Sequence, residues 1–547
     1  MIVKQYNYLK SCINTKGQLV DKKLQAPLNF QYHYSSFILS SILRKDYENL
    51  NKVLNYYFSI PTNIMKPSND FNIVLILFAV LNDEDNILDK YKSKIIESIT
   101  HNTDEELFKL NNNFRALRLL GMILESKVKE SAYSQKIYDE IDWILELQFD
   151  DGFFPDSNMK YEIHKNQGVP HLTYHAKIMM CVGFSYLYTK DARLKESFLK
   201  AMKVLLDISI DNYYFFYGRS TNALFGYGSL YISLILAYKF TNDKMYLNKA
   251  NDMKIFIENF QHTDGHISIN LNKDGNQRWG FDTYMYDIVY NAYSNALFLL
   301  GDNMIVDSEK NNIKQLAIAK ENIQIHKNSG FVVYKSKDIK YCLNFKGHQN
   351  SLKHGFDSRV SPFSILYFQN NITNLLPAIG YKPSGILSLV ETKFYFKKIY
   401  AKLYQAYYYD WLPIFSGNSF FYTRDSIKFY PFKCIKMLKL ENTIIMKFES
   451  KSRAIVFNKN KTDYFVVSIK LTESPIYKIL FYEKVDEFYY VYREIENEIN
   501  FDYTFSHKYN KLKIICIETS NKKADLHRYR FNDLKQLEIK VNILNEQ

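Results

Sequence analysis

The sequence predicts an α+β multidomain protein in which an N-terminal incomplete α/α toroid is followed by a C-terminal antiparallel β-sandwich. Apolar residues recur at helical spacing from about Phe30 to Gly301, helix-and-turn phrases repeat loosely within that region, and short β-rich segments follow it. A chain of 547 residues is long enough for two cores. We place the toroid domain at residues 1–305 and the sandwich domain at 306–547, with the boundary between 302 and 330.

Helical periodicity in the first domain defines segments that pair as hairpins. The second helix of two pairs ends in related phrases, Gln148-Phe149-Asp150-Asp151-Gly152 and Gln261-His262-Thr263-Asp264-Gly265. Such repetition is typical of hairpins stacked into a ring, and a non-closing α-solenoid that serves as a binding scaffold is the alternative. The predicted helices are 32–43, 47–58, 71–81, 87–99, 114–124, 134–147, 174–188, 194–208, 223–240, 246–260 and 283–299.

The second domain shows the spacing of an antiparallel sheet protein. Short β-branched and aromatic runs alternate with polar turns such as residues 458–461. The predicted strands are 331–334, 341–345, 443–448, 464–469, 478–482 and 513–517.

Composition narrows the function classes. The net charge of +13 favours an acidic partner, such as a polyuronate, although a solvated lysine-rich surface explains it equally well. No basic block interleaved with aromatics indicates nucleic-acid binding, and no apolar run approaches the roughly 20 residues of a membrane span. The N-terminus does not have the pattern of a secretory signal, which predicts a cytoplasmic location.

Motifs for cofactors and metals are missing from the sequence. There is no P-loop, dinucleotide-binding glycine fingerprint, HExxH motif or Gly-x-Ser-x-Gly elbow, so we expect no cofactor and no catalytic metal. The five cysteines are widely spaced, which predicts buried thiols in place of a disulfide framework or a zinc site.

A set of Tyr, His, Arg and Asn residues carries the predicted chemistry. These residues cluster in 170–175, 217–220 and 279–287, where turns meet long helical runs. Removing the C5 proton of a uronic acid needs a base, a group that neutralises the carboxylate, and an acid for the departing O4. Tyrosine and histidine supply the base and acid, and asparagine or arginine holds the carboxylate.

With these residues the chain resembles the heparinase II/III-like polysaccharide lyases, which join an α/α toroid to an antiparallel β-sandwich. Asn111-Asn112-Asn113-Phe114-Arg115 resembles the Asn-rich motif of that family, and residues 347–357 resemble its His-containing sandwich segment. The resemblance implies that Asn113 neutralises the carboxylate, that Tyr174 transfers protons and that His354 reaches into the cleft. Phe114 stands where the family often has histidine, so His175 is a candidate replacement. Uronyl C5-epimerases such as dermatan sulfate epimerase are similar in fold.

The leading prediction is a lyase that cleaves a uronic-acid glycan by β-elimination. Tyr174 or His175 abstracts the proton, Asn113 and Arg219 hold the carboxylate, and His354 completes the cleft. Tyr217 or Tyr284 protonates the leaving oxygen. The predicted substrate-binding residues are Tyr217, Trp279, Tyr284, Tyr286, Asp287 and Arg115.

Three other functions stay open. A C5-epimerase begins with the same proton abstraction. An inverting toroid hydrolase needs two carboxylates, for which Asp151, Asp156, Asp282 and Asp287 are candidates. The fourth possibility is a non-catalytic glycan-binding scaffold. Asn113 as a helix N-cap, and Tyr174 and His175 as capping or packing residues, are the structural readings of the same positions.

Overall fold

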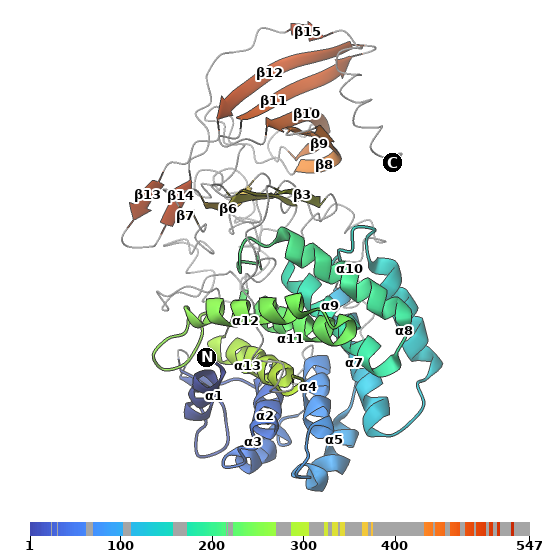
Figure 1. The fold of residues 1–547 in the computed structure, drawn as a ribbon, viewed down its shortest axis with the longest axis vertical. Coiled ribbons are helices and arrows are strands. Elements are labelled where there is room, and N and C mark those ends of the chain that lie inside the picture. The colour runs from blue at the N-terminus through green and yellow to red at the C-terminus, as the bar shows by residue number, and fades with distance from the viewer. Residues whose placement is uncertain are drawn as a thin grey trace. The chain divides into compact units, whose positions relative to one another are not determined.

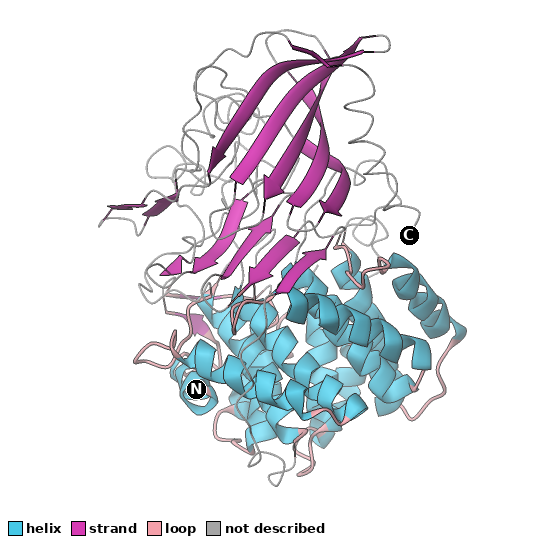
Figure 2. Ribbon diagram, turned by 45° about the horizontal axis from the view of Figure 1, so that its top comes forward, coloured by secondary structure: helices cyan, strands magenta, loops and turns pink. Residues whose placement is uncertain are grey.

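The structure is a computed structural model in which the chain divides into two compact units, a helical unit that precedes Ala319 and a second unit built mainly from Ala319–Gln547. Figure 1 colours the helices and strands by their order along the chain, and Figure 2 colours them by type. The residues described are 1–22, 25–29, 31–61, 69–101, 111–156, 172–214, 216, 223–269, 286–305, 322–326, 331–336, 340–344, 364–369, 374–375, 432–440, 443–453, 460–470, 476–485, 488–498, 503–506, 511–514 and 527–529.

Six helices form the inner wall of the helical unit, within its described residues. Each packs against the next around a full cycle, and the last one packs against the first. The inner helices are α2 (His33–Arg44), α4 (Asn69–Leu81), α7 (Asn112–Val128), α9 (Leu172–Thr189), α11 (Ala223–Thr241) and α13 (Asp287–Asn303).

An outer layer of helices alternates with the inner wall along the chain. Helices α3, α8, α10 and α12 pack against α2, α7, α9 and α11, while α1 packs against α13. Helix α5 and the short 3-10 helix η2 follow α4. The bounds are α1 (Ile2–Ser11), α3 (Leu50–Tyr57), η2 (Asp89–Tyr91), α5 (Lys92–Ser98), α8 (Gln135–Leu147), α10 (Ala192–Ile208) and α12 (Lys244–Glu258).

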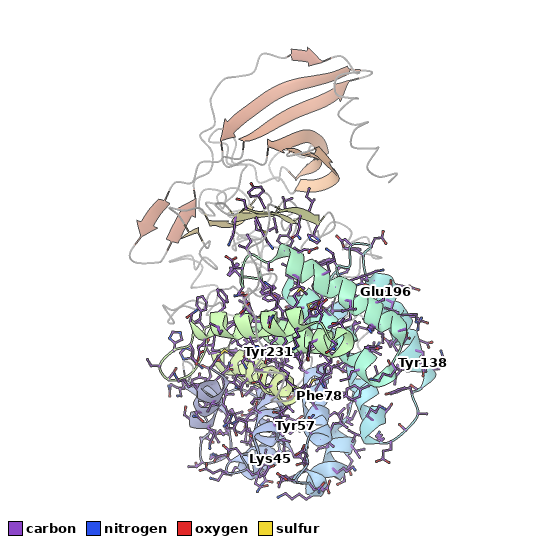
Figure 3. All side chains as sticks on the ribbon, viewed as in Figure 1. Lys45, Tyr57, Phe78, Tyr138, Glu196 and Tyr231 are labelled. Carbon is purple, nitrogen blue, oxygen red and sulfur yellow. The ribbon has the colours of Figure 1, made fainter. Side chains whose placement is uncertain are left out.

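Apolar patterning explains which helices lie inside. Helix α12 buries only one stripe, Leu247, Ala250, Met253 and Ile257, as expected of a helix with one face on the core. Helix α11 is apolar on all sides and buries nearly every residue. Figure 3 shows side chains filling the interior, where Phe78 and Tyr231 are buried, whereas Tyr138 on α8 is exposed.

By length and composition, α11 could also cross a membrane, although the sequence prediction expected no such run. Most of it is buried inside the helical unit. Its glycines allow close packing there: a Cβ on Gly228 would lie 3.1 Å from the Cα of Ser294 on α13.

The ring, which was predicted as incomplete, is closed by the contact between α13 and α2, and α1 packs against α13. Sequence reasoning overlooked α1 because the polar Gln5 lies on its buried face among Ile2, Tyr6 and Leu9. The Gln5 Nε2 atom donates hydrogen bonds to Asn291 Oδ1 and to Ser294 Oγ on α13, both at 3.0 Å. Helix α1 is therefore the outer partner of α13, so the first described helix of the chain packs against the last one.

Each of the two repeated Asp-Gly turns packs against an outer helix other than the one it follows. Gly152 and Gly265 have positive φ angles of 92° and 98°. A Cβ on Gly152 would lie 2.5 Å from the carbonyl oxygen of Lys200 on α10, and one on Gly265 would lie 2.2 Å from that of Lys4 on α1. These turns thus have a packing function. The Gly265 turn, which follows α12, packs against α1.

Antiparallel sheets make up the described part of the second unit. A five-stranded meander and a six-stranded sheet in the order β15-β12-β11-β10-β9-β8 are accompanied by the β13-β14 pair. All six predicted strands coincide with or overlap these elements. The arrangement of the two larger sheets as a β-sandwich stays a prediction.

The strands of the five-stranded sheet are β3 (Asn322–His326), β4 (Phe331–Lys335), β5 (Lys340–Asn344), β6 (Ser364–Gln369) and β7 (Asn374–Leu375). Those of the other two sheets are β8 (Phe432–Leu440), β9 (Thr443–Arg453), β10 (Asn460–Lys470), β11 (Ile476–Val485), β12 (Phe488–Glu498), β13 (Tyr503–Ser506), β14 (Lys511–Ile514) and β15 (His527–Tyr529). The helical unit has one further pair, β1 (Val20–Asp21) with β2 (Ala26–Pro27).

Candidate active site

Aromatic side chains from the start of the inner helices meet in the middle of the ring. Phe71 on α4 contacts Phe225 on α11, three positions away around the ring, with ring centroids 6.1 Å apart. Tyr32, which precedes α2, stacks on Phe71 at 4.1 Å. We call this set the aromatic floor, and it consists of Tyr32, Phe71, Phe114, Phe225, Tyr290 and Tyr293.

The floor lies at the end of the ring where the longest connections enter. Residues 190–191 alone connect α9 to α10, whereas residues 148–171 lead into α9 and residues 259–286 lead into α13. Binding and catalytic residues concentrate where a rigid scaffold carries its long connecting segments. In addition, the N-terminus of a helix carries a partial positive charge, so this end of the ring favours an anion.

A lysine side chain is buried against the floor. Lys177 on α9 is fully buried, and its Nζ lies 3.7 Å from the ring centroid of Phe71 and 4.9 Å from that of Phe114. These distances are in the range of cation–π contacts. Burial lowers the pKa of Lys177 to about 7, although Cys181, Asp156 and Asp70 act in the opposite direction.

Lys177 begins a buried hydrogen-bond chain with Asn113 and Asp156. Its Nζ donates to Asn113 Oδ1 at 2.7 Å, and Asn113 Nδ2 donates to Asp156 Oδ1. The ammonium fixes which amide atom is oxygen, and the carboxylate fixes which is nitrogen, so the amide has one orientation. Asn113 lies in the first turn of α7, and the N-cap is Asn111, so Asn113 is not the cap.

Tyr174 lies three residues before Lys177 in the first turn of α9, and residues at this spacing share a helix face. It is partly exposed, unlike most of the floor. Burial raises the pKa of Tyr32 well above its ordinary range, and the nearby phenols of Tyr290, Tyr293 and Tyr174 contribute to that increase. Tyr174 and Asn113 are therefore two predicted site residues that the structure places around the same lysine and floor.

His175 is positioned differently from its neighbour. Its Nδ1 accepts the backbone N–H of Phe154 at 2.9 Å, and its Nε2 lies 3.0 Å from the carbonyl oxygen of Ala201, to which it must donate. The ring also stacks on Phe153 and is fully buried. Because both nitrogens are engaged, the geometry fits the packing interpretation of His175 and does not favour proton abstraction.

Arg115 points toward an outer helix. Its Nε and Nη2 atoms donate to the two carboxylate oxygens of Glu140 on α8, at 2.6 and 3.2 Å. Its guanidinium also lies 3.5 Å from the ring centroid of Trp143. The predicted substrate-binding role of Arg115 therefore competes with a bidentate ion pair.

The remaining predicted residues fall into two groups. Tyr286 is the N-cap residue of α13, and Asp287 is its buried first residue. Arg219, His354, Tyr217, Trp279, Tyr284 and Asp282 lie outside the described residues.

Sequence reasoning overlooked Lys177, Tyr32 and Tyr290. A single lysine between apolar residues in the run 176–182 was the available signal, because a buried charge needs a partner. Among the described residues, no group of three or more His, Cys, Asp or Glu residues is arranged to bind a metal ion. The three described cysteine side chains, those of Cys12, Cys181 and Cys342, are buried free thiols as predicted.

No protein-family model matches the chain, and no curated protein matches it. Among solved structures, the chain is similar to a Streptomyces coelicolor chondroitin AC lyase in complex with chondroitin sulphate. The TM-score is 0.50 and the sequence identity 8%, over 90% of this chain and 67% of that chain. At this identity the likeness shows a shared fold alone.

Two shorter matches cover only part of this chain. A cellobiose 2-epimerase from Bacillus thermoamylovorans matches with a TM-score of 0.40 and 11% identity, over 54% of this chain and 95% of its own. A GH76 alpha-mannanase from Bacteroides thetaiotaomicron matches with a TM-score of 0.39 and 10% identity, over 55% and 94%. The heparinase II/III-like assignment stays a prediction.

Proposed function

We propose that this protein is a polysaccharide or oligosaccharide lyase that cleaves a uronic-acid glycan by β-elimination. The observation that carries the proposal is the placement of Tyr174 and Asn113 at one lysine, Lys177, beside the aromatic floor. A phenol and an orientated amide are the two groups that the first step requires. The chondroitin AC lyase similarity supports the fold in which these groups are placed.

In the proposed reaction, the Tyr174 phenolate removes the C5 proton of the uronic acid. The C5 electron pair is delocalised into the carboxylate and then forms the C4–C5 double bond as the C4–O4 bond breaks. Asn113 Nδ2 has a second hydrogen for which the described residues provide no acceptor, and we assign it to the substrate carboxylate. This hydrogen bond strengthens as charge develops on the carboxylate, so it lowers the barrier.

The roles of Arg219 at the carboxylate and of His354 in the cleft stay predictions, and both residues lie outside the described residues. Tyr217 or Tyr284 remains the proposed acid for the departing O4. His175 receives no proton-transfer role in this proposal, because its ring nitrogens hold the Phe154 and Ala201 backbone. The net charge of +13 and the helix N-termini at the floor favour an acidic glycan.

Epimerisation is the second candidate, because it shares the first step. The phenol of Tyr32 lies near those of Tyr174 and Tyr290, so the floor offers phenols besides Tyr174 as a second proton-transfer group. The hydrolase alternative has less support, because Asp156 is engaged with Asn113 and Asp151 accepts the backbone N–H of Phe153.

The test is incubation with a panel of polyuronates and uronic-acid glycosaminoglycans in deuterated buffer. A lyase produces a conjugated 4,5-double bond, detected as rising absorbance near the ultraviolet edge. An epimerase produces no such absorbance but incorporates deuterium at C5. New reducing ends with neither signal would indicate a hydrolase. The absence of all three signals across the panel would contradict an enzymatic role on these glycans.

A further inference from the structure

Burying Lys177 at its position costs desolvation free energy. A buried ammonium loses its hydration, and replacing a buried charge with an apolar side chain of similar size is often neutral or stabilising. Its neighbours on α9, Ile178 and Met179, show that apolar residues are accommodated in this layer. The lysine is therefore not explained by the stability of the ring.

The hydrogen bond that Lys177 donates determines the orientation of the Asn113 amide. Because Nζ donates to Asn113 Oδ1, the amide oxygen is directed toward α9 and Nδ2 is directed away from it. Asp156 then takes one Nδ2 hydrogen, so the direction of the other is set as well. A positive charge on the amide oxygen also polarises the amide and makes its N–H groups stronger donors.

We propose that Lys177 is a positioning residue for catalysis, which in its protonated form aligns and polarises the Asn113 amide for the substrate carboxylate. This inference rests on the proposed function. It assigns Lys177 no contact with the substrate.

The protonation of Lys177 depends on the groups that face it. These are Asp156 from the segment after α8, Asp70 from α4 and Cys181 on its own helix. Helices α7 and α11 contribute Asn113, Phe114 and Phe225, none of which is ionisable. Burial raises the pKa of Cys181 to about 12, so this thiol stays neutral where the lysine, with a pKa of about 7, changes charge.

Two variants separate the hydrogen bond from the charge. Lys177→Gln keeps an N–H donor without the charge, and Lys177→Met keeps neither. Lys203→Met, on the exposed side of α10, is the matched control. Initial rates on a uronate glycan that the wild type cleaves give kcat and KM from pH 5.5 to 9, and circular dichroism with thermal unfolding verifies that each variant is folded.

We expect Lys177→Met to lower kcat about a hundredfold and Lys177→Gln about tenfold, with KM nearly unchanged, because misplacement of a catalytic group acts on the transition state. In the wild type, kcat/KM should fall above pH 7, and this alkaline limb should be absent from both variants. A merely structural lysine would not produce that limb.

Wild-type kcat and an unchanged alkaline limb in either folded variant would overturn the inference and leave the proposed function intact. If neither variant folds, the wild-type profile decides, because a flat profile between pH 7 and 9 excludes a protonation requirement. A wild type that cleaves no uronate glycan overturns the proposed function and this inference together.

Discussion

Two buried polar networks of the helical unit differ in whether they contain a charge. At the contact of α1 with α13, which we call the seam, Asn291 exchanges hydrogen bonds with the Ile267 backbone and accepts from Gln5, all through neutral amides. At the aromatic floor, the chain from Lys177 through Asn113 to Asp156 has an ionisable group at each end.

The difference indicates what each network is for. Neutral amides that satisfy one another stabilise a contact without a large desolvation penalty. A buried ammonium carries that penalty, and an apolar side chain of similar size would often be at least as stable there. A buried lysine therefore indicates a role other than stability. The seam thus has a structural role, because it holds α1 against α13, whereas the floor has the properties of a functional site.

The largest expected effect separates the floor from the rest of the ring. Tyr174→Phe should lower kcat about a thousandfold, equivalent to about 4 kcal/mol, because it removes the proposed proton-transfer group. Its unfolding temperature should change little, because Tyr174 is partly exposed. Tyr138→Phe, on the exposed face of α8, is the control and should change neither quantity. A large stability loss with normal turnover would instead mark Tyr174 as a packing residue.

Exchanging asparagine for alanine in each network tests the comparison directly. Asn291→Ala should lower the free energy of unfolding by about 2–4 kcal/mol, because the Ile267 backbone loses both of its Asn291 partners and Gln5 Nε2 keeps only its hydrogen bond to Ser294 Oγ. Turnover by the folded fraction should be normal. Asn113→Ala should lower kcat by at least a hundredfold. Urea unfolding and steady-state rates measure both variants. Equal activity losses would remove the distinction between the networks.

A smaller effect tests the packing of the Gly265 turn against α1 at the seam. Gly265→Ala should cost about 1–3 kcal/mol, because φ is 98° and the new Cβ would collide with the Lys4 carbonyl. Thr263→Ala, at an exposed position in the same turn, should be close to neutral. The comparison is made by urea unfolding, and a neutral Gly265→Ala would argue against contact between the turn and α1.

The smallest effect is the pH dependence of stability. The pKa of Lys177 is about 7 in the folded chain, whereas an unperturbed lysine, as in the unfolded chain, has a pKa of 10.5. The unfolded chain therefore binds more protons between these values, so the free energy of unfolding should rise with pH there, by at most about 1.4 kcal/mol per unit. Urea unfolding at pH 7, 8 and 9 should show this slope in the wild type and in Asn291→Ala. Lys177→Met should lack it, and an unchanged slope in this variant would place the titration elsewhere.

The sequence was a good guide to the helices and strands. Helices such as α11 and α12 were predicted because apolar periodicity is a local property of the chain. Among the described helices the exception was α1, whose buried Gln5 acquires its partners only from α13, far along the chain. Strands β8 and β12 were not among those predicted.

The candidate site was predictable only in part. Asn113 and Tyr174 were named from their residue types and positions at helix starts, and they do lie beside one lysine. His175 was named for the same reason, but a helix turns by about 100° per residue, so adjacent side chains face different surroundings. The lysine itself was overlooked, because a charge within an apolar run reveals nothing about its partners.

The sequence by itself determined the helical segments, the β-rich second half and the residue types that suit uronate chemistry, since these depend on local patterning. Only the tertiary structure decided that the ring closes where α13 packs against α2, and that Lys177, Asn113 and Asp156 form one chain. The physical reason is that hydrogen-bond partners and burial are supplied by segments distant in sequence, and only folding brings them together.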